Sequence, residues 1–267
     1  MDKIGLIAGN RKFPLIFSAC AKKQGCYVVA VAIKKDTNPK INKIADKVYW
    51  LGLDEFSRLF EVFKKEGVTN VVMAGQISPR RLFGKEIVKD PILKNLLLEI
   101  KNKKADTIFG GIAKKLKDEG FELLDSTIFV NEYLPKKGVL TKSQPLPEVK
   151  EDIVFGFELA KAIGSLDIGQ TVAVKNKAIV AVEAFEGTDN LIRRSGKLAG
   201  KGLTIVKVSK PKQDMRFDIP VIGYNTVKNL VKVHAHCLAI EAEKTLFIDK
   251  EKSLQLAERF GISIVAV

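Results

Sequence analysis

Short apolar segments alternate with segments of helical period through the first half of the chain, and this rhythm constrains the fold more than any other feature. Stretches of ten or more residues separate the apolar segments, which is typical of right-handed crossovers between strands of a largely parallel sheet. Ligands of such sheets bind beyond the carboxyl ends of the strands. We expect strands at residues 4–9, 27–33, 47–51, 70–75 and 121–129, and helices at residues 13–24, 54–66, 91–102 and 106–119.

A proline- and lysine-rich stretch divides the chain. Residues 134–148 contain three prolines and cannot sustain a helix or a central strand, so we expect a linker there. Strands and helices alternate again after it, and residues 171–175 and 178–184 are close enough to form a hairpin. The fold class is therefore α/β: an N-terminal Rossmann-like parallel-sheet domain (1–133) and a second α/β domain with a mixed sheet (149–267).

The composition is that of a globular protein, with 46% apolar and 28% charged residues among 267. No apolar run approaches the roughly 18 residues of a membrane-spanning helix. The first residues lack the regions of a signal peptide, so we expect a cytoplasmic protein. Cys20, Cys26 and Cys237 form neither a CxxC pair nor an even set, which argues against structural zinc and a disulfide framework.

The net charge of +14 is spread over the whole chain: residues 1–133 carry +8 and the remainder carries +6. Only eight of the 45 cations are arginine, and no basic tail is present. Scattered lysines are a weak indication of nucleic-acid binding. A basic surface nevertheless attracts anionic lipid headgroups and multiply charged phosphate substrates.

Two strand-to-turn junctions contain glycine in the N-terminal half. Gly9-Asn10 follows the first strand and Gly75-Gln76 follows the fourth, so the two turns are expected side by side at the carboxyl edge of the sheet. Backbone N–H groups at such turns can bind phosphate or another anion. Arg11 occupies the place of the second glycine in a dinucleotide fingerprint, which argues against a nicotinamide dehydrogenase.

Three carboxylates lie within seven residues in the second half: Glu183, Glu186 and Asp189. Thr188 or Asp189 is well placed to cap the helix that follows. Capping explains one of these residues, whereas a group of carboxylates beside a helix N-terminus also suits Mg²⁺ bridging to phosphate oxygens.

Residues 210–220 contain alternating charges between two prolines, which favour an extended chain. In a strand, one ionic face would be formed by the side chains of Lys210, Lys212, Asp214, Arg216 and Asp218. Either that face is a solvated edge strand, or it combines cations that neutralise phosphate with a carboxylate that holds water or metal.

Several segments together resemble the LpxI-type UDP-2,3-diacylglucosamine pyrophosphatases of bacterial lipid A synthesis. The resemblance runs in order from Gly5 to the C-terminus. It rests on Gly5-Leu6-Ile7-Ala8-Gly9-Asn10 with Phe13-Pro14, Val72-Met73-Ala74-Gly75, Glu119-Gly120-Phe121-Glu122, Leu166-Asp167-Ile168-Gly169-Gln170, Ala181-Val182-Glu183-Ala184, Glu186-Gly187-Thr188-Asp189 with Arg193-Arg194, Lys210-Pro211 and Asp218-Ile219-Pro220.

The resemblance implies a cytoplasmic, Mg²⁺-dependent hydrolase that splits UDP-2,3-diacylglucosamine into UMP and 2,3-diacylglucosamine 1-phosphate (lipid X). It implies Asp218 as the catalytic residue and Asp218, Glu186 and Asp189 as metal ligands. The implied substrate-binding residues are Gly9, Asn10, Gly75, Gln76, Gln170, Thr188, Asp189, Lys210, Gln213 and Arg216. Two departures stand out: the family usually has glycine in place of Arg11, and Gln76 replaces a residue that varies among relatives.

The expected partners are the lipid-linked nucleotide sugar and, transiently, the inner-membrane surface, to which the protein would bind peripherally. No nucleic-acid partner is expected, and a homodimer is left open. Two alternatives remain at this point: another nucleotide-sugar-binding Rossmann-like enzyme, and a non-catalytic basic protein that binds nucleic acid.

Overall fold

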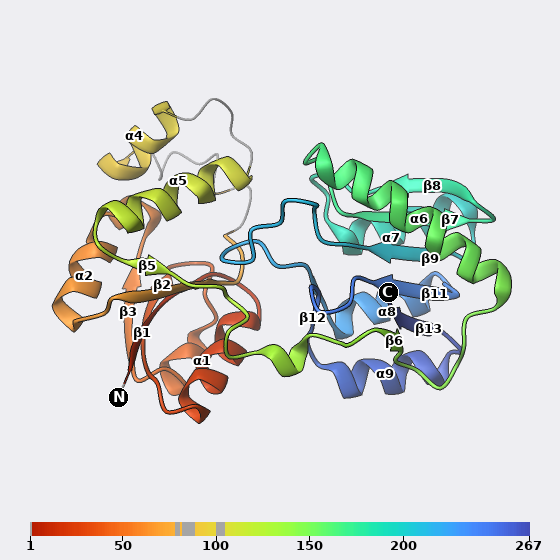
Figure 1. Cartoon of the computed structure of the whole chain (residues 1–267), viewed down its shortest axis with the longest axis horizontal. Helices are drawn as coiled ribbons and strands as arrows, with labels where there is room; N and C mark the ends of the chain where they lie inside the picture. Colours follow the sequence, from red (N-terminus) through yellow and green to blue (C-terminus); the bar gives the residue numbers. More distant parts are fainter. Residues whose placement is uncertain (1, 78–80, 82–88, 100–104) are drawn as a thin grey trace. The chain divides into compact units, whose positions relative to one another are not determined.

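The computed structural model of the chain describes residues 2–77, 81, 89–99 and 105–267 (Figure 1). Residues 100–102, which end the helix expected at residues 91–102, lie outside the described residues. The chain forms two compact units: unit 1 comprises Met1–Val130 and Asp214–Asp218, and unit 2 comprises Asn131–Gln213 and Ile219–Val267. Both are α/β, which confirms the predicted fold class. No described helix has the length and apolar character to cross a membrane.

Unit 1 is built on a five-stranded sheet of order β3-β2-β1-β4-β5, in which every neighbouring pair is parallel. Its elements are β1 (Lys3–Ala8), α1 (Phe13–Lys23), β2 (Tyr27–Ile33), β3 (Lys47–Leu51), α2 (Arg58–Glu66), β4 (Asn70–Ala74), α4 (Pro91–Glu99), α5 (Ala105–Asp118) and β5 (Glu122–Leu123), with 3-10 turns at Pro39–Lys43 and Leu53–Glu55.

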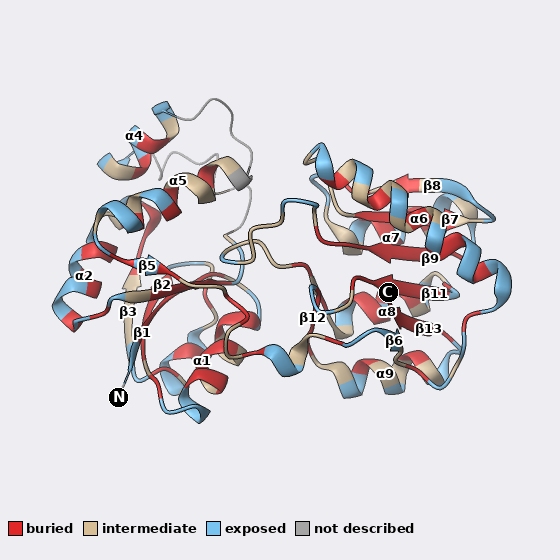
Figure 2. Ribbon diagram, in the orientation of Figure 1, coloured by how far each residue is buried: buried red, intermediate tan, exposed pale blue. Residues whose placement is uncertain are grey.

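Alternate residues of the central strands of unit 1 face opposite layers. Ile7, Val31 and Met73 belong to the core that the strands form with α2, α4 and α5. Helix α1 contacts β1, β2 and β4 and covers the other face, to which Leu6 points. Figure 2 shows buried residues concentrated in the central strands of both units.

The strand expected at residues 121–129 is wrong beyond Leu123, because only Glu122–Leu123 pairs with β4. A side chain ends it: the carboxylate of Asp125 accepts hydrogen bonds from the backbone N–H of Thr127 at 2.7 Å and from its hydroxyl at 2.6 Å. Aspartate commonly makes such local bonds in turns, and they remove the N–H groups from the sheet ladder.

Unit 2 contains a six-stranded mixed sheet of order β6-β13-β11-β9-β7-β8 and a separate β10–β12 pair. Strands β9, β11 and β13 are parallel to one another, whereas β6, β7 and β8 each run antiparallel to a neighbour. The elements are β6 (Gly138–Val139), α6 (Pro147–Ser165), β7 (Thr171–Lys175), β8 (Ala178–Val182), α7 (Thr188–Ala199), β9 (Thr204–Lys207), β10 (Val221–Ile222), α8 (Tyr224–Lys232), β11 (Cys237–Ile240), β12 (Leu246–Phe247), α9 (Lys250–Arg259) and β13 (Ser263–Ala266), with a 3-10 turn at Asn131–Tyr133.

Two apolar layers enclose the sheet of unit 2. Helix α6 packs against Val172 and Val206, whereas α7, α8 and α9 pack on the opposite face with Ile205. The predicted hairpin is confirmed as β7 and β8. Its two turn residues, Asn176 and Lys177, have φ of 52° and 58°, as the tight turn between twisted strands requires.

Candidate functional site

The turns after β1 and β4 lie against each other at the carboxyl edge of unit 1, as the sequence predicts. The N–H of Gly9 donates to the carbonyl oxygen of Ala74 at 2.8 Å, and the N–H of Asn10 donates to that of Gln76 at 2.7 Å. A Cβ at Gly9 would lie 2.7 Å from the carbonyl oxygen of Gln76, and a Cβ at Gly75 would lie 2.5 Å from that of Asn10. Glycine is therefore required at both positions by the close approach of two backbones. Their part in substrate binding stays a prediction.

Arg11 adopts a φ of 66°, in the left-handed region that glycine enters without strain. This backbone conformation suits the glycine that the resemblance leads us to expect at this position. Here a positively charged side chain takes its place beside the turn.

The segment Asp214–Asp218 belongs to unit 1, although its sequence neighbours belong to unit 2. The hydroxyl of Ser126 lies 2.7 Å from the carbonyl oxygen of Met73 and 2.6 Å from that of Arg216. The side chain of Phe217 packs against the core of unit 1. Because Met73 lies near the end of β4, Ser126 holds the segment that carries the predicted catalytic aspartate beside the carboxyl end of that strand.

The extended conformation expected for residues 210–220 is wrong, and with it the single ionic face: the segment forms turns. The side chain of Gln213 accepts the backbone N–H of Lys210 at 2.7 Å. The carboxylate of Asp214 accepts the backbone N–H of Arg216 at 3.1 Å. These local bonds occupy the N–H groups that a strand would offer to a neighbour.

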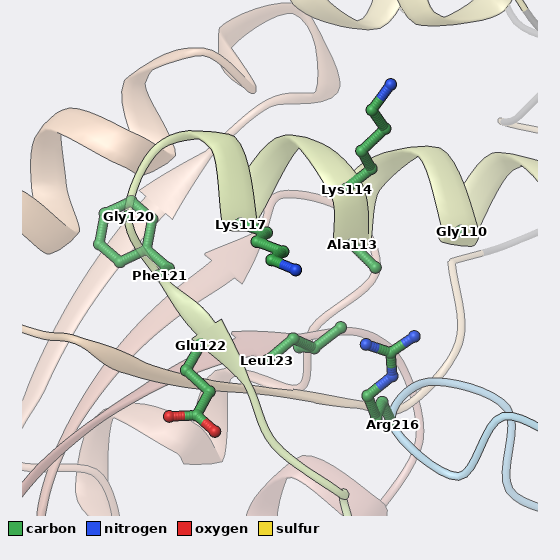
Figure 3. A pocket seen from close by; sticks show the side chains of 9 residues that line it. All are labelled: Gly110, Ala113, Lys114, Lys117, Gly120, Phe121, Glu122, Leu123 and Arg216. Carbon is green, nitrogen blue, oxygen red and sulfur yellow. The ribbon is translucent and has the colours of Figure 1, made fainter.

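Arg216 and Asp214 form a two-point ion pair, with Nε–Oδ1 at 2.9 Å and a terminal nitrogen 2.7 Å from Oδ2. This pairing lowers the pKa of the Asp214 carboxyl and outweighs the opposite effect of partial burial. Arg216 also lines a groove of about 730 Å³ between α5 and β5, and Figure 3 shows its side chain and that of Lys117 directed into this space. The lining residues are Gly110, Ala113, Lys114, Lys117, Gly120, Phe121, Glu122, Leu123 and Arg216.

A buried row of polar side chains crosses the sheet of unit 2 where α7 begins. Thr171 lies opposite Lys207 in the β7–β9 register, and the N–H of Glu183 donates to the carbonyl oxygen of Thr171 at 2.9 Å. The hydroxyl of Thr188 donates to Oε1 of Glu183 at 2.8 Å and accepts from Nζ of Lys207, also at 2.8 Å. Lys207 and Glu183 are 4% and 7% exposed, so the network is shielded from water.

The expected helix cap is wrong: Gly187 is the N-cap of α7, and no side chain caps the helix. Thr188 is the first helical residue, and its hydroxyl is turned toward the sheet instead. Asp189 accepts a hydrogen bond at Oδ1 from the hydroxyl of Thr226 at 3.2 Å. This contact joins the first turns of α7 and α8, which therefore lie together at the carboxyl edge of the sheet.

The predicted metal ligands are distributed between the units. Asp218 belongs to unit 1, and Glu186 and Asp189 belong to unit 2. Both carboxylate oxygens of Glu186 face Arg194, one of them at 3.2 Å from Nε. Within the described ranges, no group of three or more His, Cys, Asp and Glu side chains is arranged to hold a metal ion.

The remaining predicted residues of unit 2 line the end of α6. Nζ of Lys210 lies 2.7 Å from a carboxylate oxygen of Asp167, and both side chains are mostly buried. The carbonyl oxygen of Gln170 accepts the N–H of Val208 at 2.9 Å, which fixes the strand that precedes Lys210.

Buried acceptor atoms without a hydrogen-bond partner occur at positions that the sequence singles out. Among the described residues, the atoms without a partner are Oδ1 of Asn10, Oε1 of Gln170, Oε2 of Glu183 and Oγ1 of Thr245. An unsatisfied buried acceptor costs about 1–3 kcal/mol, so it calls for an explanation. In unit 1 a ligand that donates to Asn10 would satisfy that atom, and in unit 2 a ligand that donates to Gln170 or Glu183 would satisfy those.

Sequence reasoning missed Thr171 and Lys207. Lys207 was one of 45 cations in a lysine-rich chain. A signal was nevertheless present, because Lys207 interrupts an apolar strand on the same face as Ile205. An unbroken period-two pattern would have an apolar residue there.

Comparisons with known proteins cover both units. Residues 3–133 match the model of the LpxI N-terminal domain, and residues 136–265 match that of the LpxI C-terminal domain. The chain is also similar to the UDP-2,3-diacylglucosamine pyrophosphatase LpxI of Caulobacter vibrioides, with 29% identity over 279 residues, covering 100% of this chain and 98% of that protein.

Solved structures show a more distant likeness. The biotin carboxylase subunit of pyruvate carboxylase is 15% identical with a TM-score of 0.28, over 77% of this chain and 44% of that one. N5-carboxyaminoimidazole ribonucleotide synthetase from Thermotoga maritima is 18% identical with a TM-score of 0.24, over 71% of this chain and 43% of that one. The chain thus spans less than half the length of these proteins, and TM-scores this low do not establish a shared fold.

Proposed function

Because the chain belongs to the LpxI family, we propose that it hydrolyses the pyrophosphate bond of UDP-2,3-diacylglucosamine, releasing UMP and lipid X. The observation that carries this proposal is the full-length similarity to the Caulobacter pyrophosphatase. In unit 1, the turns at Gly9 and Gly75 and the segment with Asp218 lie at the carboxyl edge where sheets of this type bind ligands.

Asp218 is proposed as the central catalytic residue. A carboxylate supplies oxygen atoms of the kind that Mg²⁺ prefers as ligands. Lys210 or Arg216 is proposed to neutralise pyrophosphate oxygens, for which it would exchange its present carboxylate partner for phosphate. Water then supplies the oxygen that binds phosphorus as the bridging P–O bond breaks, and the nucleotide and lipid phosphates leave separately.

A carboxylate oxygen of Asp218 or of Asp189 is the kind of donor that fits Mg²⁺, which commonly takes one or two carboxylates together with substrate phosphates and waters. Glu186, the third predicted ligand, would have to release Arg194 first. Bound Mg²⁺ would supply charge neutralisation at the pyrophosphate.

The two acyl chains of the proposed substrate require transient contact with a membrane. Burial of each CH₂ group is worth about 0.8 kcal/mol, so the chains leave the bilayer only for another apolar surface. The net charge of +14 favours an approach to anionic lipid, and vesicle binding is then expected to weaken with salt.

Chromatography of the reaction products tests the proposed hydrolysis. Equal amounts of UMP and lipid X should form from UDP-2,3-diacylglucosamine with Mg²⁺ and not with EDTA. Release of UDP instead of UMP would contradict the assignment. A rise in melting temperature with NAD would favour a dinucleotide enzyme, and salt-sensitive retention of RNA on a filter would favour a nucleic-acid-binding protein.

A further inference from the structure

Glu183 carries an unsatisfied buried atom whose chemistry is unambiguous. Rotation of the amides of Asn10 and Gln170 would exchange an unpaired oxygen for an unpaired nitrogen, so these side chains indicate only a polar ligand. The two oxygens of Glu183 are equivalent, and no rotation turns Oε2 into a donor. Oε2 therefore needs a hydrogen-bond donor or a cation.

The hydroxyl of Thr188 cannot donate to a ligand in this network. Thr188 has a single hydroxyl proton, which it donates to Oε1 of Glu183 at 2.8 Å. The same hydroxyl accepts a hydrogen bond from Lys207 at 2.8 Å. Thr188 thus has no proton left for a substrate, and its side chain positions the carboxylate.

The charges around Glu183 favour a neutral donor. The ammonium of Lys207 is one hydroxyl group away, and the guanidinium of Arg194 donates to the carbonyl oxygen of Val182 at 3.0 Å. These two cations disfavour a metal ion at Oε2, and the charge of the carboxylate disfavours phosphate. A neutral hydroxyl or amide donor is repelled neither by the two cations nor by the carboxylate.

We propose that Oε2 of Glu183 accepts a hydrogen bond from a sugar hydroxyl of the substrate, with Thr188 and Lys207 as positioning residues. This rests on the proposed function. Glu183 follows β8 directly, at the carboxyl edge of the sheet. Oε2 is buried, so a hydroxyl reaches it only when neighbouring groups shift, and the contact is then shielded from water. The substrate offers hydroxyls on the ribose and, because positions 2 and 3 of glucosamine are acylated, on carbons 4 and 6.

Substrate analogues combined with variants test this inference. Glu183→Gln keeps the shape of the side chain, and Glu151→Gln, in an exposed ion pair with Lys177, is the matched control. Wild type and both variants are assayed on UDP-2,3-diacylglucosamine and on its 4-deoxy, 6-deoxy, 2′-deoxyribose and 3′-deoxyribose analogues. The dissociation constant of each is measured in EDTA, and kcat/KM with Mg²⁺.

Glu183→Gln is expected to lower kcat/KM and affinity about 10- to 100-fold on the full substrate, and Glu151→Gln less than about 2-fold. On the one analogue that lacks the bound hydroxyl, wild type and Glu183→Gln should become equal within about 2-fold. That analogue identifies which sugar is held, and a merely structural role could not produce this equality.

The inference is overturned if Glu183→Gln loses the same factor on every analogue, or if it matches wild type on the full substrate. Binding without hydrolysis by wild type would refute the proposed reaction, while the dissociation constants would still decide the role of Glu183. Wild type that fails to bind the substrate would overturn both.

Discussion

Glu183 and Lys207 bond to the same hydroxyl group: Oγ1 of Thr188 donates to the glutamate and accepts from the lysine, both at 2.8 Å. Both charged residues are buried. Thr188 joins two strands of the sheet in unit 2 to the start of α7, so the candidate site and the stability of the unit depend on the same contacts.

Replacement of Lys207 by Met is expected to destabilise the protein by about 1–3 kcal/mol, because the buried hydroxyl of Thr188 loses its donor and the carboxylate of Glu183 loses a neighbouring cation. Urea denaturation measures this loss. The double variant Lys207→Met/Glu183→Gln should recover a large part of it. Lys177 belongs to an exposed ion pair, so Lys177→Met should not measurably change the free energy of unfolding. An equal loss in this control would show that the effect of Lys207→Met does not come from its burial.

The close contact between the two glycine turns of unit 1 can be measured with a matched pair of variants. Gly25 and Gly75 have nearly the same φ, 85° and 84°. A Cβ at Gly25 meets nothing within 4 Å, whereas one at Gly75 lies 2.5 Å from the carbonyl oxygen of Asn10. Gly25→Ala should therefore cost only the left-handed strain, about 1–2 kcal/mol. Gly75→Ala should cost clearly more in the same denaturation assay, and equal costs would refute the close approach.

Glu241 makes the stability of unit 2 depend on pH in the acidic range. Burial alone would raise its pKa, but hydrogen bonds from Lys161, Lys244 and Ser209 prevail and bring it to about 2. Because the pKa of Glu241 is lower in the folded chain than its unfolded value of about 4.5, its charged carboxylate stabilises the fold above about pH 4.5. This stabilisation is lost as the pH falls through about 2.

The contribution of Glu241 is about 3 kcal/mol at neutral pH, from about 1.4 kcal/mol per pKa unit. Glu241→Gln removes this titration, so the stability difference between wild type and variant should shrink steadily from pH 5 toward pH 2. Urea denaturation across that range measures it. A difference independent of pH would show that the carboxylate is not held in its charged form.

Much of the fold is predictable from local pattern. Strands such as Tyr27–Ile33 are apolar on both faces because helices cover both sides of a parallel sheet, and the positions of Gly9 and Gly75 follow from that topology. Residues 210–220 were misread because alternating charge mimics a strand, whereas the side chains of Gln213 and Asp214 bond to nearby backbone. Periodicity does not register such bonds.

The residues of the candidate site are likewise predictable in part from the sequence. Asp218 and Arg216 were singled out from a motif, but their attachment to unit 1 depends on Ser126, about ninety residues earlier in the chain, and no local pattern indicates it. Glu183 was noticed as one of three neighbouring carboxylates. Glu183 differs from Glu186 only in the folded chain. There Lys207 bonds to Thr188, the partner of Glu183, whereas Arg194 bonds to Glu186.

The most direct test of the account is the release of UMP from UDP-2,3-diacylglucosamine by wild type, Asp218→Ala and Asp218→Asn at saturating Mg²⁺. Asp54→Asn, an exposed aspartate of unit 1, serves as the control, and melting temperatures verify folding. The account predicts that both Asp218 variants fold normally and lose at least about 100-fold in turnover, while the control retains it. Near wild-type turnover by Asp218→Asn would contradict the central role of this carboxylate.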